Sequence, residues 1–242
     1  MISEKKILKT FQHLIKQSDA DDLIIVGSGD DAAVLDPKGR NIVHSLDISK
    51  INTHFPFNFL PEDIAYRSVA VALSDLAAMG AYPSFMTIGL TCDSEDLKWY
   101  ENFTIGIENS IKDFKVELVG GDVTFGDINV CVNVFGFLFN EPLKRSGAIP
   151  GDKIYVTGRL GMGRQGLEDI KKNIHSKFSK KFKKPEPQFA KSKYISNLAS
   201  SCIDISDGLI KDLSSICSMS NVGASINFED IPVLKDIDDL TN

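Results

Sequence analysis

The feature that most constrains the fold is the spacing of apolar side chains along residues 41–134, which changes between every second position and every third or fourth position. Residues 41–48 alternate, with Val43, Ser45 and Asp47 on one face and mostly apolar side chains on the other, which is the period of a β-strand. Residues 61–79 instead repeat apolar side chains every three or four positions, which is the period of an amphipathic helix. Because strand-like and helix-like segments alternate irregularly along the chain, the sequence predicts an α+β fold with mixed sheets.

End signals bound the expected elements. Pro61 with Glu62 and Asp63 is typical of a helix start, and Gly80 is typical of a helix end. The sequence predicts helices to about residue 17, over 61–79 and 162–176, and from a cap at Asp93-Ser94-Glu95-Asp96 to about Phe114. It predicts strands over 23–26, 41–48, 85–91, 116–119, 128–134 and 153–157. A turn-rich segment at 145–152 indicates a boundary, so the predicted domains are 1–145 and 146–242.

Composition narrows the class of protein. The 242 residues, 43% hydrophobic and 25% charged, are typical of a globular protein. A net charge of −6 argues against nucleic acid as the main partner. No run approaches the roughly 18 apolar residues of a membrane span, and the charged start is unlike a signal peptide. The four cysteines are isolated from one another, which predicts reduced thiols in a cytoplasmic protein rather than a zinc site or a disulfide framework.

Carboxylates recur beside glycine or serine at the ends of strand-like segments. They occur in Gly29-Asp30-Asp31, Ser45-Leu46-Asp47, Ser74-Asp75, Gly120-Gly121-Asp122 and Asp204-Ile205-Ser206-Asp207-Gly208. Each acid alone has a structural explanation, such as a turn at Asp30 or a helix cap at Asp207. As a converging set they would repel, by roughly 3 kcal/mol for a pair about 5 Å apart at an effective dielectric near 20, unless cations neutralise them.

The donor set indicates which cation. Oxygen ligands without histidine or cysteine favour Mg²⁺, which commonly links protein carboxylates to substrate phosphates. We therefore interpret Asp30 and Asp31 as residues that help to hold magnesium, and the metal rather than a glycine loop as the group that holds a nucleotide. The sequence contains no G-x-x-x-x-G-K-[ST] loop, which agrees with this interpretation.

One glycine motif favours a different function. Gly161–Gly166 matches G-x-G-x-x-G and follows the strand expected at 153–157, as in a dinucleotide-binding oxidoreductase. However, a lysine-rich stretch comes next, and Glu186 sits between two prolines instead of ending a second strand. A helix entry is the better interpretation of this motif.

Together the motifs resemble the thiamine-monophosphate kinase family, within the superfamily of aminoimidazole ribonucleotide synthetase. The matching segments are Gly29–Ala32, Ser45–Asp47, His54-Phe55, Leu73–Ala81, Gly120–Asp122, Arg145–Ala148, Pro150–Asp152 and Ile203–Leu209. Their order and spacing extend over nearly the whole chain.

The resemblance implies a two-domain aminoimidazole ribonucleotide synthetase-like fold. The N-terminal mixed sheet, with helices on one face, would form a shared barrel in a homodimer and bind ATP and Mg²⁺ near the dimer interface; a C-terminal α/β domain would follow. The implied activity is ATP-dependent phosphorylation of thiamine monophosphate to thiamine diphosphate by direct in-line transfer, with several Mg²⁺ ions.

The resemblance also implies roles for individual residues. The metal ligands would be Asp31, Ser45, Asp47, Asp75, Asp122, Asp204 and Asp207, joined by Asp30 from the motif itself. The ATP contacts would be Gly121, Asp122, Arg145 and Ser206, and His54 would contact the substrate. No single acid or base would be the catalyst; the metal array at Asp31, Asp75 and Asp122 would be.

The chain departs from the family's pattern in several places. Leu46 stands where the family usually has Thr, and Val123 and Phe125 replace the usual Thr and Arg. The family also continues beyond residue 242, so we expect an incomplete C-terminal domain. Two alternatives therefore remain open: another ATP-dependent enzyme of the superfamily that acts on a different acceptor, or a nucleotide-binding remnant without activity.

Overall fold

The computed structural model describes residues 3–14, 23–26 and 34–233. The chain divides into two compact units, one formed by Met1–Leu76 with Tyr82–Leu138 and the other by Ala77–Ala81 with Phe139–Asn242. No helix in the described ranges is both long enough and apolar enough to cross a bilayer.

A four-stranded mixed sheet, ordered β3-β6-β4-β5, is the centre of the first unit. Its strands are β3 (Ile42–Lys50), β4 (Ala81–Thr91), β5 (Glu117–Thr124) and β6 (Asn129–Leu138). β3 pairs antiparallel with β6, and β4 pairs parallel with β5. Val130, Val132 and Val134 of β6 are fully buried, whereas the residues between them are only partly buried. The period-two pattern in the sequence therefore identifies the covered face of the sheet.

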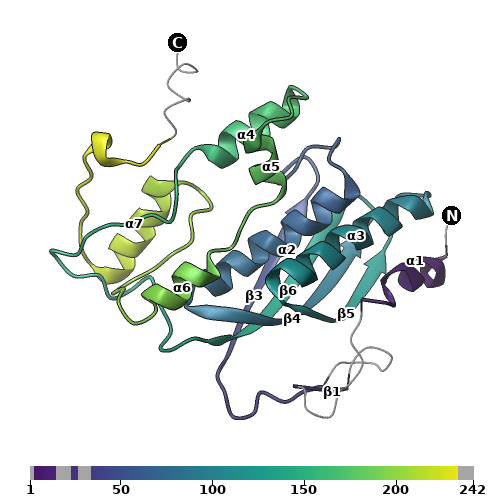
Figure 1. Cartoon of the computed structure of the whole chain (residues 1–242), viewed down its shortest axis with the longest axis horizontal. Helices are drawn as coiled ribbons and strands as arrows, with labels where there is room; N and C mark the ends of the chain where they lie inside the picture. The colour runs from purple at the N-terminus through teal and green to yellow at the C-terminus, as the bar shows by residue number, and fades with distance from the viewer. Residues whose placement is uncertain (1–2, 15–22, 27–33, 234–242) are drawn as a thin grey trace. The chain divides into compact units, whose positions relative to one another are not determined.

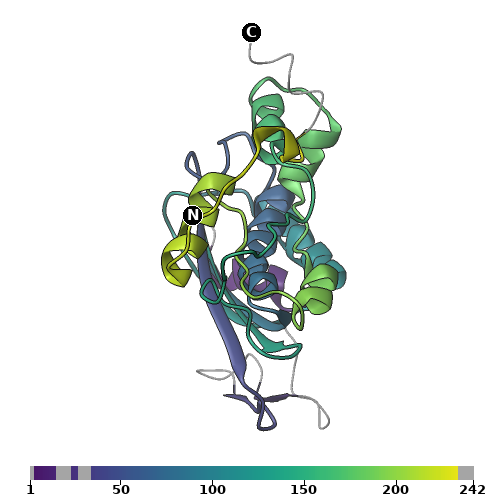
Figure 2. The same cartoon turned by 90° about the vertical axis from the view of Figure 1, so that its left-hand side faces the viewer.

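Two long helices, α2 (Pro61–Ala78) and α3 (Leu97–Phe114), lie side by side over one face of this sheet (Figures 1 and 2). Their close approach depends on Gly106, because a Cβ there would lie 2.2 Å from the carbonyl oxygen of Glu62 and 2.7 Å from the Cβ of Ala65. The predicted N-terminal cap of α3 is confirmed, since the Asp96 carboxylate accepts a hydrogen bond from the Lys98 N–H at 2.9 Å.

Smaller elements complete the first unit. They are α1 (Glu4–Phe11), β1 (Ile24–Val26) and β2 (Val34–Leu35), and the last two pair antiparallel. Ile24 joins a buried cluster with Phe85, Val119 and Phe137 of the large sheet. The helix expected to reach about residue 17 ends at Phe11, and residues 15–17 lie outside the described ranges.

Among residues 139–233, the regular elements of the second unit are helices. It contains α4 (Met162–Lys171), α5 (Lys177–Lys183), α6 (Phe189–Ile195), α7 (Leu209–Ser220) and a 3₁₀ turn, η1 (Phe228–Asp230). The strand predicted at 153–157 is wrong: Ile154 is 45% exposed, Tyr155 is 82% exposed, and no neighbouring strand supplies a hydrogen-bond ladder among residues 139–233. An apolar run alone does not make a strand when nothing pairs with it.

The helix predicted over 162–176 is shorter than expected, and a second helix, α5, begins only at Lys177. α4 ends at Lys171, and Asn173 takes a left-handed conformation with φ of 57°. The Ser176 hydroxyl then caps α5 by accepting the N–H groups of Phe178 and Ser179. Despite these local differences, the α+β class and the two-domain fold with a mixed N-terminal sheet are confirmed.

Candidate functional site

β3 and α2 bring three of the predicted metal ligands together. Ser45 and Asp47 are two residues apart on β3 and therefore share one face of the strand. The Ser45 hydroxyl donates a hydrogen bond to Oδ2 of Asp75 on α2 at 2.5 Å. All three side chains are partly buried. The negative charge of Asp75 also raises the pKa of Asp47, so the two carboxylates interact electrostatically. The Ser45 hydroxyl links β3 to the Asp75 carboxylate.

Burial raises the pKa of Asp47 above its ordinary value. The backbone N–H of Ile48, which donates to this carboxylate at 2.7 Å, opposes the shift, whereas the negative charge of Asp75 adds to it. Arg67 of α2 faces the same carboxylate, and burial lowers the pKa of its guanidinium to about 10. The site thus combines Asp47, whose charged form is disfavoured by burial, with the partly buried guanidinium of Arg67.

His54 lies in the loop between β3 and α2. Its Nδ1 accepts a hydrogen bond from the backbone N–H of Lys50 at 2.9 Å. An imidazole nitrogen that accepts carries no proton, so the neutral ring holds its proton on Nε2. His54 is exposed, and its Nε2–H can donate to an anionic oxygen of a ligand.

The Gly120-Gly121-Asp122 segment is part of a strand rather than a turn. β5 continues through it to Thr124, and Val119 is an extra residue between the pairs Met86–Leu118 and Thr87–Gly120. Such a bulge increases the local twist of a strand. Gly121 is opposite Ile88, and a Cβ on it would lie 2.4 Å from the Ile88 carbonyl oxygen. This glycine therefore has a packing role beside its predicted contact with ATP.

Asp122 is not beside Asp47 and Asp75 in the first unit. β5 and β3 are the opposite edges of the four-stranded sheet, with two strands between them. The Asp122 side chain is exposed and accepts the N–H of its neighbour Val123 at 2.9 Å. The unit therefore presents Asp122 separately from the Ser45, Asp47 and Asp75 group.

The second unit contains Arg145, Asp204, Ser206 and Asp207. Asp207 is exposed and forms an ion pair with Lys211 at 2.5 Å. The alternative role of Asp207 as a helix cap is wrong, because Gly208 is the N-cap of α7. The backbone N–H groups of Ser206 and Asp207 both bind the carboxylate of Asp212.

Two predicted metal ligands, Asp30 and Asp31, lie outside the described residues. Over residues 3–14, 23–26 and 34–233, no group of three or more histidine, cysteine, aspartate or glutamate side chains is arranged to hold a metal. The Ser45, Asp47 and Asp75 group has two carboxylates and a hydroxyl.

Sequence reasoning missed Arg67 and Asp212. Arg67 is the single cation in an otherwise apolar helix segment and precedes Asp75 by about two turns, a pattern that could have marked it. Asp212 is an acid in the first turn of a helix, where it can accept the N–H groups that begin the helix.

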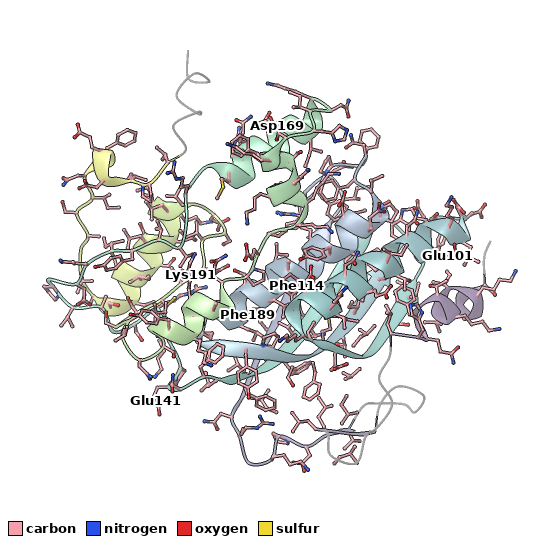
Figure 3. The ribbon with its side chains drawn as sticks, in the orientation of Figure 1. Glu101, Phe114, Glu141, Asp169, Phe189 and Lys191 are labelled. Carbon is pink, nitrogen blue, oxygen red and sulfur yellow. The ribbon has the colours of Figure 1, made fainter. Side chains whose placement is uncertain are left out.

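Two other features of the second unit have structural explanations. Asp169 on α4, labelled in Figure 3, is buried and accepts hydrogen bonds from Gln165 and Ser176, which fixes the turn between α4 and α5. No strand precedes the Gly161–Gly166 motif in the described part of this unit. A Cβ on Gly166 would lie 2.2 Å from the carbonyl oxygen of Phe178, so this glycine serves helix packing. The dinucleotide interpretation loses its structural context.

Two family models match the chain: the N-terminal domain of AIR synthase related proteins over residues 29–138, and the C-terminal domain over residues 150–241. A thiamine-monophosphate kinase of Buchnera aphidicola subsp. Schizaphis graminum is 38% identical over 224 residues, covering 89% of this chain and 69% of that protein. The Escherichia coli K12 thiamine-monophosphate kinase is 37% identical over 216 residues, covering 86% of this chain and 66% of that protein. The chain thus spans about two thirds of the length of these relatives.

Solved structures agree in fold. The crystal structure of thiamine-monophosphate kinase from Stenotrophomonas maltophilia K279a is 29% identical, with a TM-score of 0.83, over 98% of this chain and 77% of that one. A structure of AaThiL complexed with AMPPCP and TMP is 26% identical, with a TM-score of 0.77, over 82% of this chain and 67% of that one. With both domain models, identities above 35% to curated kinases and this structural agreement, the chain belongs to the thiamine-monophosphate kinase family of AIR synthase related proteins.

Proposed function

We propose that this chain phosphorylates thiamine monophosphate to thiamine diphosphate with ATP as the phosphoryl donor. The observation that carries the proposal is the Ser45, Asp47 and Asp75 group beside partly buried Arg67, in a chain 38% identical to a curated thiamine-monophosphate kinase. AMPPCP and TMP are bound in a related structure, AaThiL. The two substrates proposed here are ATP and the same monophosphate.

The donor set of the first unit fits Mg²⁺. The carboxylates of Asp47 and Asp75 and the hydroxyl of Ser45 are hard oxygen donors, and no imidazole or thiolate is among them. Burial first, and the charge of Asp75 in addition, raise the pKa of Asp47. A bound cation would therefore stabilise the ionised form of this carboxylate. We propose that these three residues hold Mg²⁺ together with Asp30 and Asp31, that Asp122 does so at the opposite edge of the sheet, and that Asp204 and Asp207 do so in the second unit. Bound Mg²⁺ would offset the repulsion between two phosphate-bearing substrates.

The chain's own residues then have distinct tasks. Arg67 supplies a fixed positive charge behind Asp47, so the carboxylate keeps a counter-charge before any ligand arrives. His54 offers Nε2–H to the substrate, because its Nδ1 is already engaged by Lys50. Gly121, Arg145 and Ser206 are the proposed ATP contacts.

The acceptor needs no strong general base. A phosphate monoester has its second pKa near 6, so it is already largely dianionic at neutral pH. Its oxygen can attack directly when it is held in line with the transferred phosphoryl group. We therefore propose direct transfer without a phosphoenzyme, in the first domain, residues 1–145, assisted by the second, residues 146–242.

The first unit also supports a homodimer. Ile42, Leu46 and Ile48 point outward from β3, and each side chain is 45–50% exposed. β3 is an edge of the four-stranded sheet, and an exposed apolar row on an edge strand favours association. A Leu46→Lys variant should shift the protein toward monomer in size-exclusion chromatography with light scattering. We further propose a cytoplasmic location, supported by four free cysteines.

The activity is tested by incubating the full chain with ATP, Mg²⁺ and thiamine monophosphate and measuring thiamine diphosphate by chromatography. Asp75→Asn should lower turnover by about 100-fold or more, because it removes a carboxylate that would hold the Mg²⁺ that neutralises phosphoryl charge. Asp96→Asn is the matched control, since asparagine also caps a helix and the site is left intact.

The outcomes separate the alternatives. Turnover with a different acceptor, and none with thiamine monophosphate, would identify another enzyme of the superfamily. Magnesium-dependent ATP binding without any product would identify the inactive remnant. Near-normal activity of Asp75→Asn would refute the proposed site.

A further inference from the structure

Helix α7 carries a buried acid that binds the loop in front of it. Oδ2 of Asp212 accepts three backbone hydrogen bonds: from Ser206 at 3.0 Å, from Asp207 at 3.1 Å and from Gly208 at 3.1 Å. Asp212 is only 6% exposed, whereas all three donor residues are exposed. An internal carboxylate therefore occupies the N–H groups of an exposed loop that holds Ser206 and Asp207, a proposed ATP contact and a proposed metal ligand.

This contact sets the polarity of the loop. In a trans peptide the N–H and the C=O point in opposite directions, and the described chain contains no cis peptide. Three successive N–H groups that point at Asp212 turn the carbonyl groups of Ile205, Ser206 and Asp207 away from it. Free N–H groups before a helix would suit a phosphate. With those N–H groups engaged, the open side of the loop offers oxygen atoms, which suit a cation.

The other end of α7 holds the second proposed ATP segment. The Ser220 hydroxyl accepts the N–H groups of Gly147 and Ala148, each at 3.1 Å, and donates to the carbonyl oxygen of Arg145 at 3.1 Å. Gly147 has φ of 121°, and a Cβ on it would lie 2.5 Å from the Ser200 carbonyl oxygen. The loop after Arg145 is thus fixed both by Ser220 and by a backbone contact that only glycine permits.

We infer that Asp212 is a positioning residue that turns the Ser206-Asp207-Gly208 loop into a cation-facing surface. Ser220 acts in the same way, through the opposite end of α7, on the loop that carries Arg145. Neither side chain touches substrate; each acts through the backbone of residues that would. This inference rests on the proposed function, because it assumes that the loop faces the metal ion that would bind together with ATP.

Hydrogen exchange tests the contact directly. In the full chain, the amides of Ser206, Asp207 and Gly208 should exchange about tenfold faster in Asp212→Ala than in the unchanged protein, because they lose their acceptor. Asp212→Asn keeps an acceptor oxygen without the charge, so exchange should rise only about threefold. Ser214→Ala is the matched control on α7: its hydroxyl binds only the Ile210 carbonyl of its own helix, and loop exchange should not change.

Metal binding tests the consequence. Mn²⁺ binding, measured by water-proton relaxation in the presence of AMPPCP, should weaken about tenfold in Asp212→Ala and no more than about threefold in Asp212→Asn. Ser220→Ala should instead speed exchange at Gly147 and Ala148 and weaken AMPPCP binding, with exchange at Ser206, Asp207 and Gly208 unchanged. This difference separates the two ends of α7.

Several results would overturn the inference. Unchanged exchange and unchanged Mn²⁺ binding in Asp212→Ala would show that the carboxylate does not order the loop. Equal losses in Asp212→Ala and Asp212→Asn, accompanied by an equal fall in Tm, would show general destabilisation instead of positioning. If Asp212→Ala does not fold, Asp212→Asn decides the question, and unchanged loop exchange in that variant overturns the inference. A chain that fails to phosphorylate thiamine monophosphate would refute the proposed function but leave these two readouts intact.

Discussion

Replacing Gly121 with alanine should destabilise the first unit, even though this glycine lies in a segment proposed to contact ATP. The added Cβ would lie 2.4 Å from the carbonyl oxygen of Ile88, which belongs to the backbone of the paired strand. Ordinary contacts of this kind are about 3.5 Å, so β5 must move by roughly 1 Å or its register with β4 must break. Overpacking of this kind costs about 1–3 kcal/mol.

Gly120→Ala is the control, one residue earlier on the same strand. Its Cβ would lie 3.8 Å from Cγ2 of Thr87, which is an ordinary contact. A tolerated Gly→Ala change stabilises by about 0.4–1 kcal/mol through the unfolded chain. The two variants should therefore differ by about 1.5–4 kcal/mol, or about 3–15 °C in Tm.

Thermal unfolding followed by circular dichroism, without ATP, measures this difference. If Gly121 served only the nucleotide, the Tm of Gly121→Ala without ATP would equal that of the unchanged protein, and only the stabilisation by added ATP would fall. A Gly121→Ala protein as stable as Gly120→Ala would refute the packing argument.

Three further predictions concern the site in the first unit. Because burial and the charge of Asp75 raise the pKa of Asp47 above its ordinary value, its ionised form destabilises the fold; Asp47→Asn should therefore raise the Tm at pH 7, and the gain should shrink as the pH falls toward 4. Equal gains at both pH values, or a loss, would contradict this reading. EDTA should abolish turnover and leave the far-UV circular dichroism spectrum unchanged, since the group of Ser45, Asp47 and Asp75 is held by β3 and α2 themselves; loss of helix signal would refute that independence. His54→Ala should raise KM for thiamine monophosphate about tenfold, which corresponds to the loss of one charge-assisted hydrogen bond, with a smaller change in kcat. Steady-state kinetics measures both constants, and an unchanged KM would contradict the proposed substrate contact.

The sequence alone determined the elements whose signals are local. The valine alternation of β6, the Asp96 cap of α3 and the Gly80 stop after α2 each follow from the period or the chemistry of a few neighbouring residues. The same holds for the family, since its motifs are short runs of adjacent residues. Candidate ligands such as Ser45, Asp47 and Asp75 could therefore be named before their positions were known.

Tertiary structure decided which of these residues meet. Ser45 reaches Asp75 because β3 lies under α2, whereas Asp122 stands apart because two strands separate β5 from β3. The apolar run at 153–157 is no strand, since a strand requires a hydrogen-bonded neighbour and local periodicity cannot supply one. Arg67 and Asp212 acquire their roles through burial and through contacts with partners that the helix geometry brings near. Periodicity is a property of neighbours along the chain, whereas burial and charge pairing depend on distances that only the folded backbone fixes.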